Sequence, residues 1–130
     1  MKTIATVVLA AALVIPIGCG SSSPGVPAPR MLTVEVLDNS YNPQQLQINS
    51  GDTVRWVLVG AAPTHTVTAL GGSFDSGAIF LQPGDTYDRT FNQNNATFEY
   101  FCQAHGACTA CTMKGSVQVG PGAPPPNPGY

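Results

Sequence analysis

Hydrophobic and polar residues alternate through the middle of the chain. The alternation is clearest at Val34 and Val36, at Leu46 and Ile48, and along Val54, Trp56 and Leu58. It continues through three later runs: His65, Val67 and Ala69; Tyr87, Arg89 and Phe91; Phe98, Tyr100 and Cys102. A period of two belongs to a strand with one buried face, whereas a helix would repeat every 3.6 residues. The pattern therefore predicts a series of half-buried strands.

Turn-forming residues separate these segments at short intervals. The turns are predicted at residues 38–40, 49–52, 60–63, 71–72, 83–85 and 92–95. Seven or eight short strands divided in this way are typical of an all-β fold, a Greek-key β-sandwich or barrel. We expect this domain to span residues 31–119. The large aromatic side chains are predicted to fill its core: Trp56, Phe91, Phe98 and Tyr100.

The N-terminal segment has the plan of an export signal. Lys2 precedes an apolar stretch from Ile4 to Ile17, which leads to Gly18 and Cys19. A cysteine after a small residue at this place resembles the lipobox of bacterial lipoproteins, although Pro16 stands where that motif usually has Leu. The resemblance implies that residues 1–18 are removed and that Cys19 is lipidated. Ordinary signal cleavage and an uncleaved anchor are the alternatives, and all three place the domain outside the cytoplasm.

Two segments rich in Pro, Gly and Ser flank the predicted domain. Residues 19–30 are expected to be a linker that carries the lipid anchor, and residues 120–130 a disordered tail. The protein is then expected in the cell envelope, tethered to a membrane, and facing the periplasm if the cell is Gram-negative.

Length and charge limit the possible functions. A chain of 130 residues holds one small domain and not a multidomain enzyme. Its formal net charge is −2, so it offers no basic surface for nucleic acid.

The residues with distinctive chemistry are two histidines, a cysteine and a methionine. The alternation turns both His65 and Cys102 toward one end of the core, and His105 and Met113 follow on the next loop. Two imidazoles, one thiolate and one thioether match the ligand set of a type 1 copper site, with a weak axial Met. Thiolate and thioether favour Cu(I) and imidazole accepts either oxidation state, so the set predicts a redox-active copper ion.

Short motifs follow one another in a specific order through the domain. They are Tyr41-Asn42-Pro43, Gly51-Asp52-Thr53-Val54-Arg55-Trp56, His65-Thr66-Val67-Thr68, Phe74-Asp75-Ser76-Gly77, Pro83-Gly84-Asp85, and Tyr100-Phe101-Cys102-Gln103-Ala104-His105 ending in Met113-Lys114-Gly115. This order and spacing over residues 32–119 resemble the small blue copper proteins of the plastocyanin-like (cupredoxin) family. The resemblance implies that His65, Cys102, His105 and Met113 bind one copper ion, and that electrons pass through the more exposed His105.

Residues around these ligands have supporting roles in this interpretation. Thr66 and Asp75 are candidates to hydrogen-bond the ligand loops and fix their geometry. A small uncharged patch is predicted around His105, formed by Pro63, Ala104, Gly106 and Ala107. Such a patch suits brief docking with a redox partner.

The loop after His105 departs from the family pattern. Seven residues separate His105 from Met113, whereas plastocyanin-like members have four. The added stretch contains Cys108 and Cys111, for which we expect a disulfide, since the compartment is oxidising. The alternatives are a zinc or thiolate cluster with Cys102 and His105, or free thiols that take up Cu(I) or replace Met113.

The leading hypothesis is a membrane-tethered, monomeric one-electron carrier and not an enzyme. Its expected partners are redox proteins of the envelope electron-transfer chain. A copper chaperone or scavenger that uses the Cys108 and Cys111 thiols is the alternative. A copper enzyme would need an open coordination position or a second metal site, to which no further histidine is available.

Overall fold

The computed structural model describes residues 27–61, 64–78, 80, 82–105 and 112–121. Their elements in chain order are β1 (Met31–Val36), β2 (Tyr41–Asn42), β3 (Gln45–Ile48), β4 (Thr53–Leu58), β5 (Thr68–Ala69), β6 (Thr86–Thr90), β7 (Ala96–Phe101), the 3-10 turn η1 (Gln103–His105) and β8 (Lys114–Val119). No helix among these residues has the length and apolar character needed to cross a bilayer. The predicted all-β fold with seven or eight strands is confirmed.

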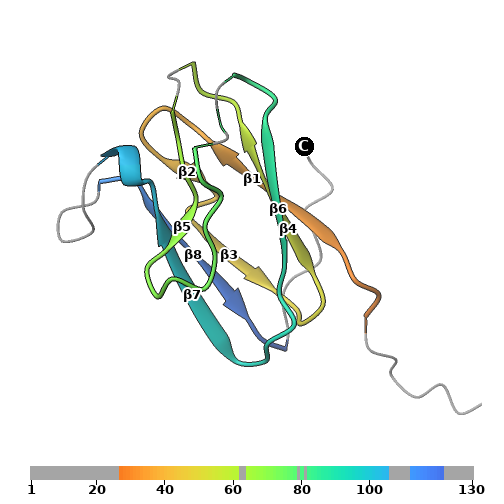
Figure 1. The fold of residues 1–130 in the computed structure, drawn as a ribbon. Coiled ribbons are helices and arrows are strands. Elements are labelled where there is room, and N and C mark those ends of the chain that lie inside the picture. Colours follow the sequence, from red (N-terminus) through yellow and green to blue (C-terminus); the bar gives the residue numbers. More distant parts are fainter. Residues whose placement is uncertain (1–26, 62–63, 79, 81, 106–111, 122–130) are drawn as a thin grey trace, which may run out of the picture.

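The strands form two sheets that face each other across one core (Figure 1). One sheet has the order β2-β1-β4-β6 and the other β3-β8-β7-β5. Two pairs, β1 with β4 and β3 with β8, are parallel, although all the elements are strands or short turns. Parallel neighbours cannot be joined by a tight hairpin, and between β1 and β4 the chain passes to the other sheet to form β3.

Register brings the alternating apolar residues of neighbouring strands onto the same inner face. Val34 lies opposite Trp56, and Val36 lies opposite Leu58. A shift of one residue would turn each of these side chains to solvent, so burial fixes the pairing. All four are at most 1% exposed.

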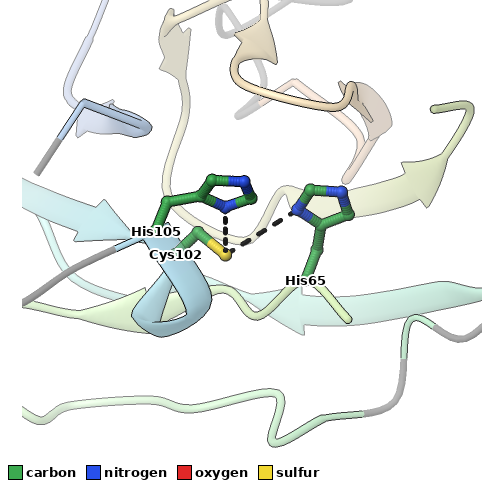
Figure 2. A group of neighbouring side chains, drawn as sticks. All are labelled: His65, Cys102 and His105. Atoms are coloured by element: carbon green, nitrogen blue, oxygen red, sulfur yellow. Dashed lines mark hydrogen bonds between the residues drawn. The ribbon is translucent and has the colours of Figure 1, made fainter. Parts of the chain in front are cut away.

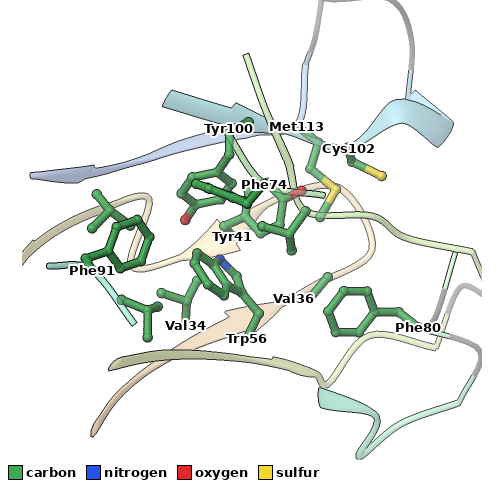
Figure 3. Packing of buried hydrophobic residues seen from close by; sticks show 14 of the residues in the cluster. Val34, Val36, Tyr41, Trp56, Phe74, Phe80, Phe91, Tyr100, Cys102 and Met113 are labelled. Carbon is green, nitrogen blue, oxygen red and sulfur yellow. The ribbon is translucent and has the colours of Figure 1, made fainter. Parts of the chain in front are cut away.

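Trp56 lies at the centre of the core. Its ring contacts those of Phe74, Tyr87, Phe91 and Tyr100, with centroid separations between 5.4 and 6.5 Å. Figure 3 shows Trp56 packed with Phe74, Phe91 and Tyr100, and Cys102 and Met113 at one end of the cluster. The aromatic residues expected in the core lie there, with Phe98 at its partly buried margin.

The predicted strand through His65, Val67 and Ala69 is wrong in its extent. Only Thr68 and Ala69 form a strand, and His65 makes a single bridge with Phe80. All five residues from 65 to 69 are buried, so the alternation in burial is absent here. The segment 74–77 pairs with Val67, Thr68 and Ala69, and the Thr66 and Thr68 side chains are hydrogen-bonded to one another, to the Gln103 amide and to Asp75.

The two ends of the sandwich differ in composition. We call one end the histidine pole, defined by His65, Cys102, His105 and Met113, and the other the arginine pole, defined by Arg30, Asn49, Asp52 and Gly120. Residues 27–30, coloured orange, leave the domain at the end away from η1 (Figure 1). The end of β8 lies at that same pole, where the Gly120 amide donates to the carbonyl of Ile48.

Candidate metal centre

Cys102 lies directly after β7, at the point where the strand leaves the sheet. Its amide donates to the Met113 carbonyl at 3.1 Å, which extends the β7–β8 pairing by one residue. The alternation that buries Tyr100 also buries Cys102, and both are 0% exposed. Among the described residues Cys102 is the only cysteine, and it is a free thiol.

His105 is brought back over Cys102 by the turn η1. The amide of His105 donates to the Cys102 carbonyl at 3.2 Å, which closes the turn. Its Nδ1 lies 3.4 Å from Cys102 Sγ, and its side chain is half-buried. The two-residue spacing between the cysteine and the histidine therefore places both donor atoms on one side of a single turn.

His65 approaches the same sulfur atom from a distant part of the chain. Its Nδ1 lies 3.8 Å from Cys102 Sγ, and the side chain is fully buried. Figure 2 shows both imidazole rings with a nitrogen directed at the sulfur. The rings lie nearly parallel, with an interplanar angle of 12° and centroids 5.1 Å apart.

The backbone before His65 has an unusual conformation. Thr64 has a φ of 76°, in the left-handed region that β-branched residues seldom adopt. Its amide donates to the Phe80 carbonyl at 3.1 Å, which anchors the turn. Such strain persists only where the surrounding structure imposes it, and here it immediately precedes a buried histidine.

The three donor atoms are close enough to share one ion. One ligand atom from each of His65, Cys102 and His105 lies within 4.8 Å of the other two. Bond lengths in zinc sites are about 2.3 Å to sulfur and about 2.0–2.1 Å to nitrogen, so one ion spans sulfur and nitrogen atoms up to about 4.4 Å apart. Both sulfur–nitrogen distances, 3.4 and 3.8 Å, are within this limit.

Met113 is the nearest further sulfur ligand along the described chain. It is 0% exposed and immediately precedes β8. Figure 3 shows its side chain beside Cys102 at the same end of the core. The lengthened loop itself, with Gly106, Ala107, Cys108 and Cys111, lies outside the described residues, as do Cys19 and Pro63. Ala104 of the predicted patch is exposed.

Thr66 joins the two ligand segments. Its amide donates to Cys102 Sγ at 3.4 Å, and its Oγ1 accepts from the Gln103 amide at 2.9 Å. Its carbonyl accepts from the Tyr41 hydroxyl at 2.6 Å. The expected support from Thr66 is therefore present, and it involves the backbone as well as the side chain.

Two supporting residues were not identified from the sequence. Tyr41 lies in one of the motifs, but the sequence did not indicate its hydrogen bond to Thr66, because the two residues are 25 positions apart. Thr68 also received no role, although it hydrogen-bonds both Thr66 and Asp75. The only local signal was a pair of threonines spaced by two in a segment otherwise expected to be half-exposed.

Known proteins resemble this chain in sequence and in fold. The family model of copper-binding proteins, plastocyanin/azurin family, matches residues 30–120. An oxidized amicyanin variant is 27% identical, and the match covers 68% of this chain and 80% of amicyanin with a TM-score of 0.54. The Cu(I) form of another amicyanin variant is 26% identical over the same shares, with a TM-score of 0.53. A purple cupredoxin from Nitrosopumilus maritimus, 22% identical over 68% of this chain and 98% of that one, shares the fold with a TM-score of 0.55.

Proposed function

Since this chain belongs to the plastocyanin/azurin family of copper-binding proteins, we propose that it carries single electrons on one copper ion bound by His65, Cys102, His105 and Met113. The observation that supports this best is the convergence of two imidazole nitrogens on the Cys102 sulfur. Copper bound there would supply one-electron redox chemistry between Cu(I) and Cu(II).

The protein supplies a ligand set that suits both oxidation states. The Cys102 thiolate and the Met113 thioether are soft ligands, whereas the imidazoles accept either state. Cys102 and His65 are fully buried, and Thr66 connects their segments through two hydrogen bonds. A ligand frame held in this way changes little when the charge changes, which favours rapid electron transfer over substrate chemistry. We therefore assign the protein as a carrier and not an enzyme.

His105 is the route between the site and a redox partner in this proposal. It is the more exposed of the two histidines, and exposed Ala104 precedes it in η1. An apolar surface beside a partly exposed ligand suits the small, short-lived interfaces of electron-transfer complexes. The partner would be another redox protein of the cell envelope.

The tether forms the second part of the proposal. We propose that the chain is exported and lipidated at Cys19, which lies outside the described residues. Residues 27–30 leave from the arginine pole, so an anchor there would leave the histidine pole facing away from the membrane. The test is Cys19→Ser, which should move the protein from the membrane fraction to the soluble fraction.

The decisive experiment is the absorption and EPR spectrum of the protein loaded with Cu(II). A strong thiolate-to-copper absorption band in the visible range is the expected result. The matched control is the double variant Cys108→Ser/Cys111→Ser, which should keep that band. If the wild-type protein lacks the band and retains only Cu(I), and the double variant loses that Cu(I), the protein is a copper chaperone or scavenger.

A further inference from the structure

A chain of hydrogen bonds connects an exposed carboxylate to the metal centre. Asp75 Oδ1 lies 3.0 Å from Thr68 Oγ1, and Thr68 Oγ1 lies 3.0 Å from Thr66 Oγ1. Thr66 Oγ1 is in turn 2.9 Å from the amide of Gln103, the residue that follows Cys102. None of the side chains of Asp75, Thr68 and Thr66 belongs to the ligand set.

The available protons fix the direction of this chain. An ionised carboxylate only accepts, so the Thr68 hydroxyl donates to Asp75. A backbone amide only donates, so Thr66 Oγ1 accepts from Gln103. The Thr68 proton is already used, and the Thr66 hydroxyl must therefore donate to Thr68. Through Thr68, Asp75 thus sets the orientation of the Thr66 hydroxyl. In this orientation a lone pair of Thr66 Oγ1 faces the Gln103 amide.

The position of Asp75 is itself fixed by a paired segment. Asp75 Oδ1 also accepts from the Gly77 amide at 2.8 Å. The next residue, Ser76, exchanges hydrogen bonds with Val67: its amide donates to the Val67 carbonyl at 3.1 Å, and its Oγ accepts from the Val67 amide at 2.8 Å. On the other side of Asp75, the Phe74 carbonyl accepts from the Ala69 amide, so residues 67–69 hold the segment that carries the carboxylate on both sides.

Every polar group of Thr66 takes part in a hydrogen bond. The carbonyl accepts from Tyr41, the hydroxyl lies between Gln103 and Thr68, and the amide donates to Cys102 Sγ. Any rotation of the Thr66 side chain would release the Gln103 amide beside the cysteine. The hydrogen bonds that connect Asp75 through Thr68 to Thr66 oppose that rotation.

We propose that Asp75 is a positioning residue for the metal centre, acting through Thr68 to hold Thr66 against the Cys102 sulfur. Its consequence for the copper ion rests on the proposed function. A donor to a thiolate favours the reduced state, because the sulfur carries more negative charge when the metal carries less positive charge. The hydrogen-bond chain therefore raises the reduction potential.

The charge of Asp75 acts in the opposite direction. A negative charge near the site disfavours reduction, so removing it alone raises the potential. Loss of the hydrogen-bond chain and loss of the charge therefore have opposite signs. This difference separates positioning from simple electrostatics.

The test compares reduction potentials of four variants of the full chain. Thr68→Val breaks the hydrogen-bond chain and keeps the charge, so it should lower the potential, by up to a tenfold change in the Cu(II)/Cu(I) equilibrium, or about 59 mV. Thr68→Ser should restore the wild-type value. Asp75→Asn keeps an acceptor oxygen and removes the charge, so it should raise the potential, in the same direction as the exposed control Glu99→Gln. An unchanged or raised potential in Thr68→Val would overturn the proposal.

A second measurement is independent of copper. In the copper-free protein, Thr68→Val and Asp75→Ala should move the NMR amide proton signals of Thr66 and Gln103 upfield, because both hydrogen bonds weaken. Glu99→Gln should leave both signals in place. If the wild-type protein shows no copper–thiolate band, the proposed function fails while these signals still test the hydrogen-bond chain. Unmoved signals in folded variants would show that Asp75 and Thr68 do not position Thr66.

Discussion

The two poles of the sandwich use polar side chains in different ways. At the arginine pole, buried Asp52 accepts from the amide and the guanidinium of Arg30 at 2.9 and 2.7 Å, and from the Asn49 amide at 2.9 Å. At the histidine pole, the donor atoms of His65, Cys102 and His105 converge on one another. The arginine pole therefore satisfies its charge within the chain, whereas the histidine pole brings three potential metal-ligand atoms close to one another.

The comparison shows how one small domain separates stability from function. Removing one partner of a buried ion pair lowers the free energy of unfolding, because the other charge is left buried and uncompensated. Ligand atoms that face one another contribute little to it and hold the geometry for a metal. Substitutions at the two poles should therefore change different measured quantities.

Cys102→Ser should have the largest effect on the histidine pole. Serine lacks the soft sulfur ligand, so we expect complete loss of the copper–thiolate absorption band and much weaker Cu(I) binding. The arginine pole is untouched, and the copper-free protein should unfold within about 1 kcal/mol of wild type, the scale of one buried hydrogen-bonding group. Titration with copper and thermal melts of the copper-free protein measure the two effects. A large loss of stability in the copper-free protein would show that the poles are not independent.

Histidine-to-glycine variants should reveal the difference in solvent access between the two histidines of the histidine pole. Added imidazole can reach the space left in His105→Gly, because His105 is half-exposed, and should restore the absorption band. His65 is 0% exposed, so His65→Gly should need a far higher imidazole concentration or show no recovery. The measurement is an imidazole titration followed by absorption. Equal recovery in both variants would contradict the assigned difference in access.

Asp52→Asn should weaken the arginine pole and leave the metal centre unchanged. Removing the charge replaces the ion pair with Arg30 by a neutral contact, at a cost of about 1.5–3 kcal/mol. Denaturant unfolding of the copper-free protein measures this loss, and the absorption band of the copper-loaded protein is the control. A changed band would show that the two poles are coupled.

The same carboxylate predicts how stability depends on pH. Burial raises the pKa of Asp52, but the hydrogen bonds from Arg30 and Asn49 and the Arg30 charge outweigh it, so the pKa lies below its usual value. Its contribution is fully present above the unfolded-state pKa of about 3.9 and is lost as pH falls through the lower folded-state pKa. Melts of the copper-free protein between about pH 5 and 2 should fall less steeply for Asp52→Asn than for wild type.

Thr64→Gly should have the smallest effect, and it should be stabilising. Glycine accepts the φ of 76° without steric cost, although it also increases the freedom of the unfolded chain. The net gain should be about 1 kcal/mol in the unfolding free energy of the copper-free protein. Thr64→Ala is the matched control and should give no gain, since alanine keeps a Cβ. A destabilised Thr64→Gly would mean that the Thr64 side chain supports His65 in another way.

Local patterns in the sequence determined the strands and the chemistry of the ligands. Alternation depends on neighbouring residues alone, so it correctly predicted the inner faces of β1, β4 and β7. The two-residue spacing between Cys102 and His105 also acts within one turn. The identity of His65 and Met113 as candidate ligands followed from their chemistry and from the family resemblance.

Only the tertiary structure decided which distant groups meet. The parallel pairing of β1 with β4, the contact of Tyr41 with Thr66, and the ion pair between Arg30 and Asp52 each join residues that are far apart in the chain. The same applies to the hydrogen bond from the Thr66 amide to the Cys102 sulfur, 36 residues away. A backbone amide is the same group in nearly every residue, so the sequence carries no sign of which one reaches the sulfur. Pairing of β5 with β7 within one sheet makes that choice, because it brings the residues just before β5 against the end of β7.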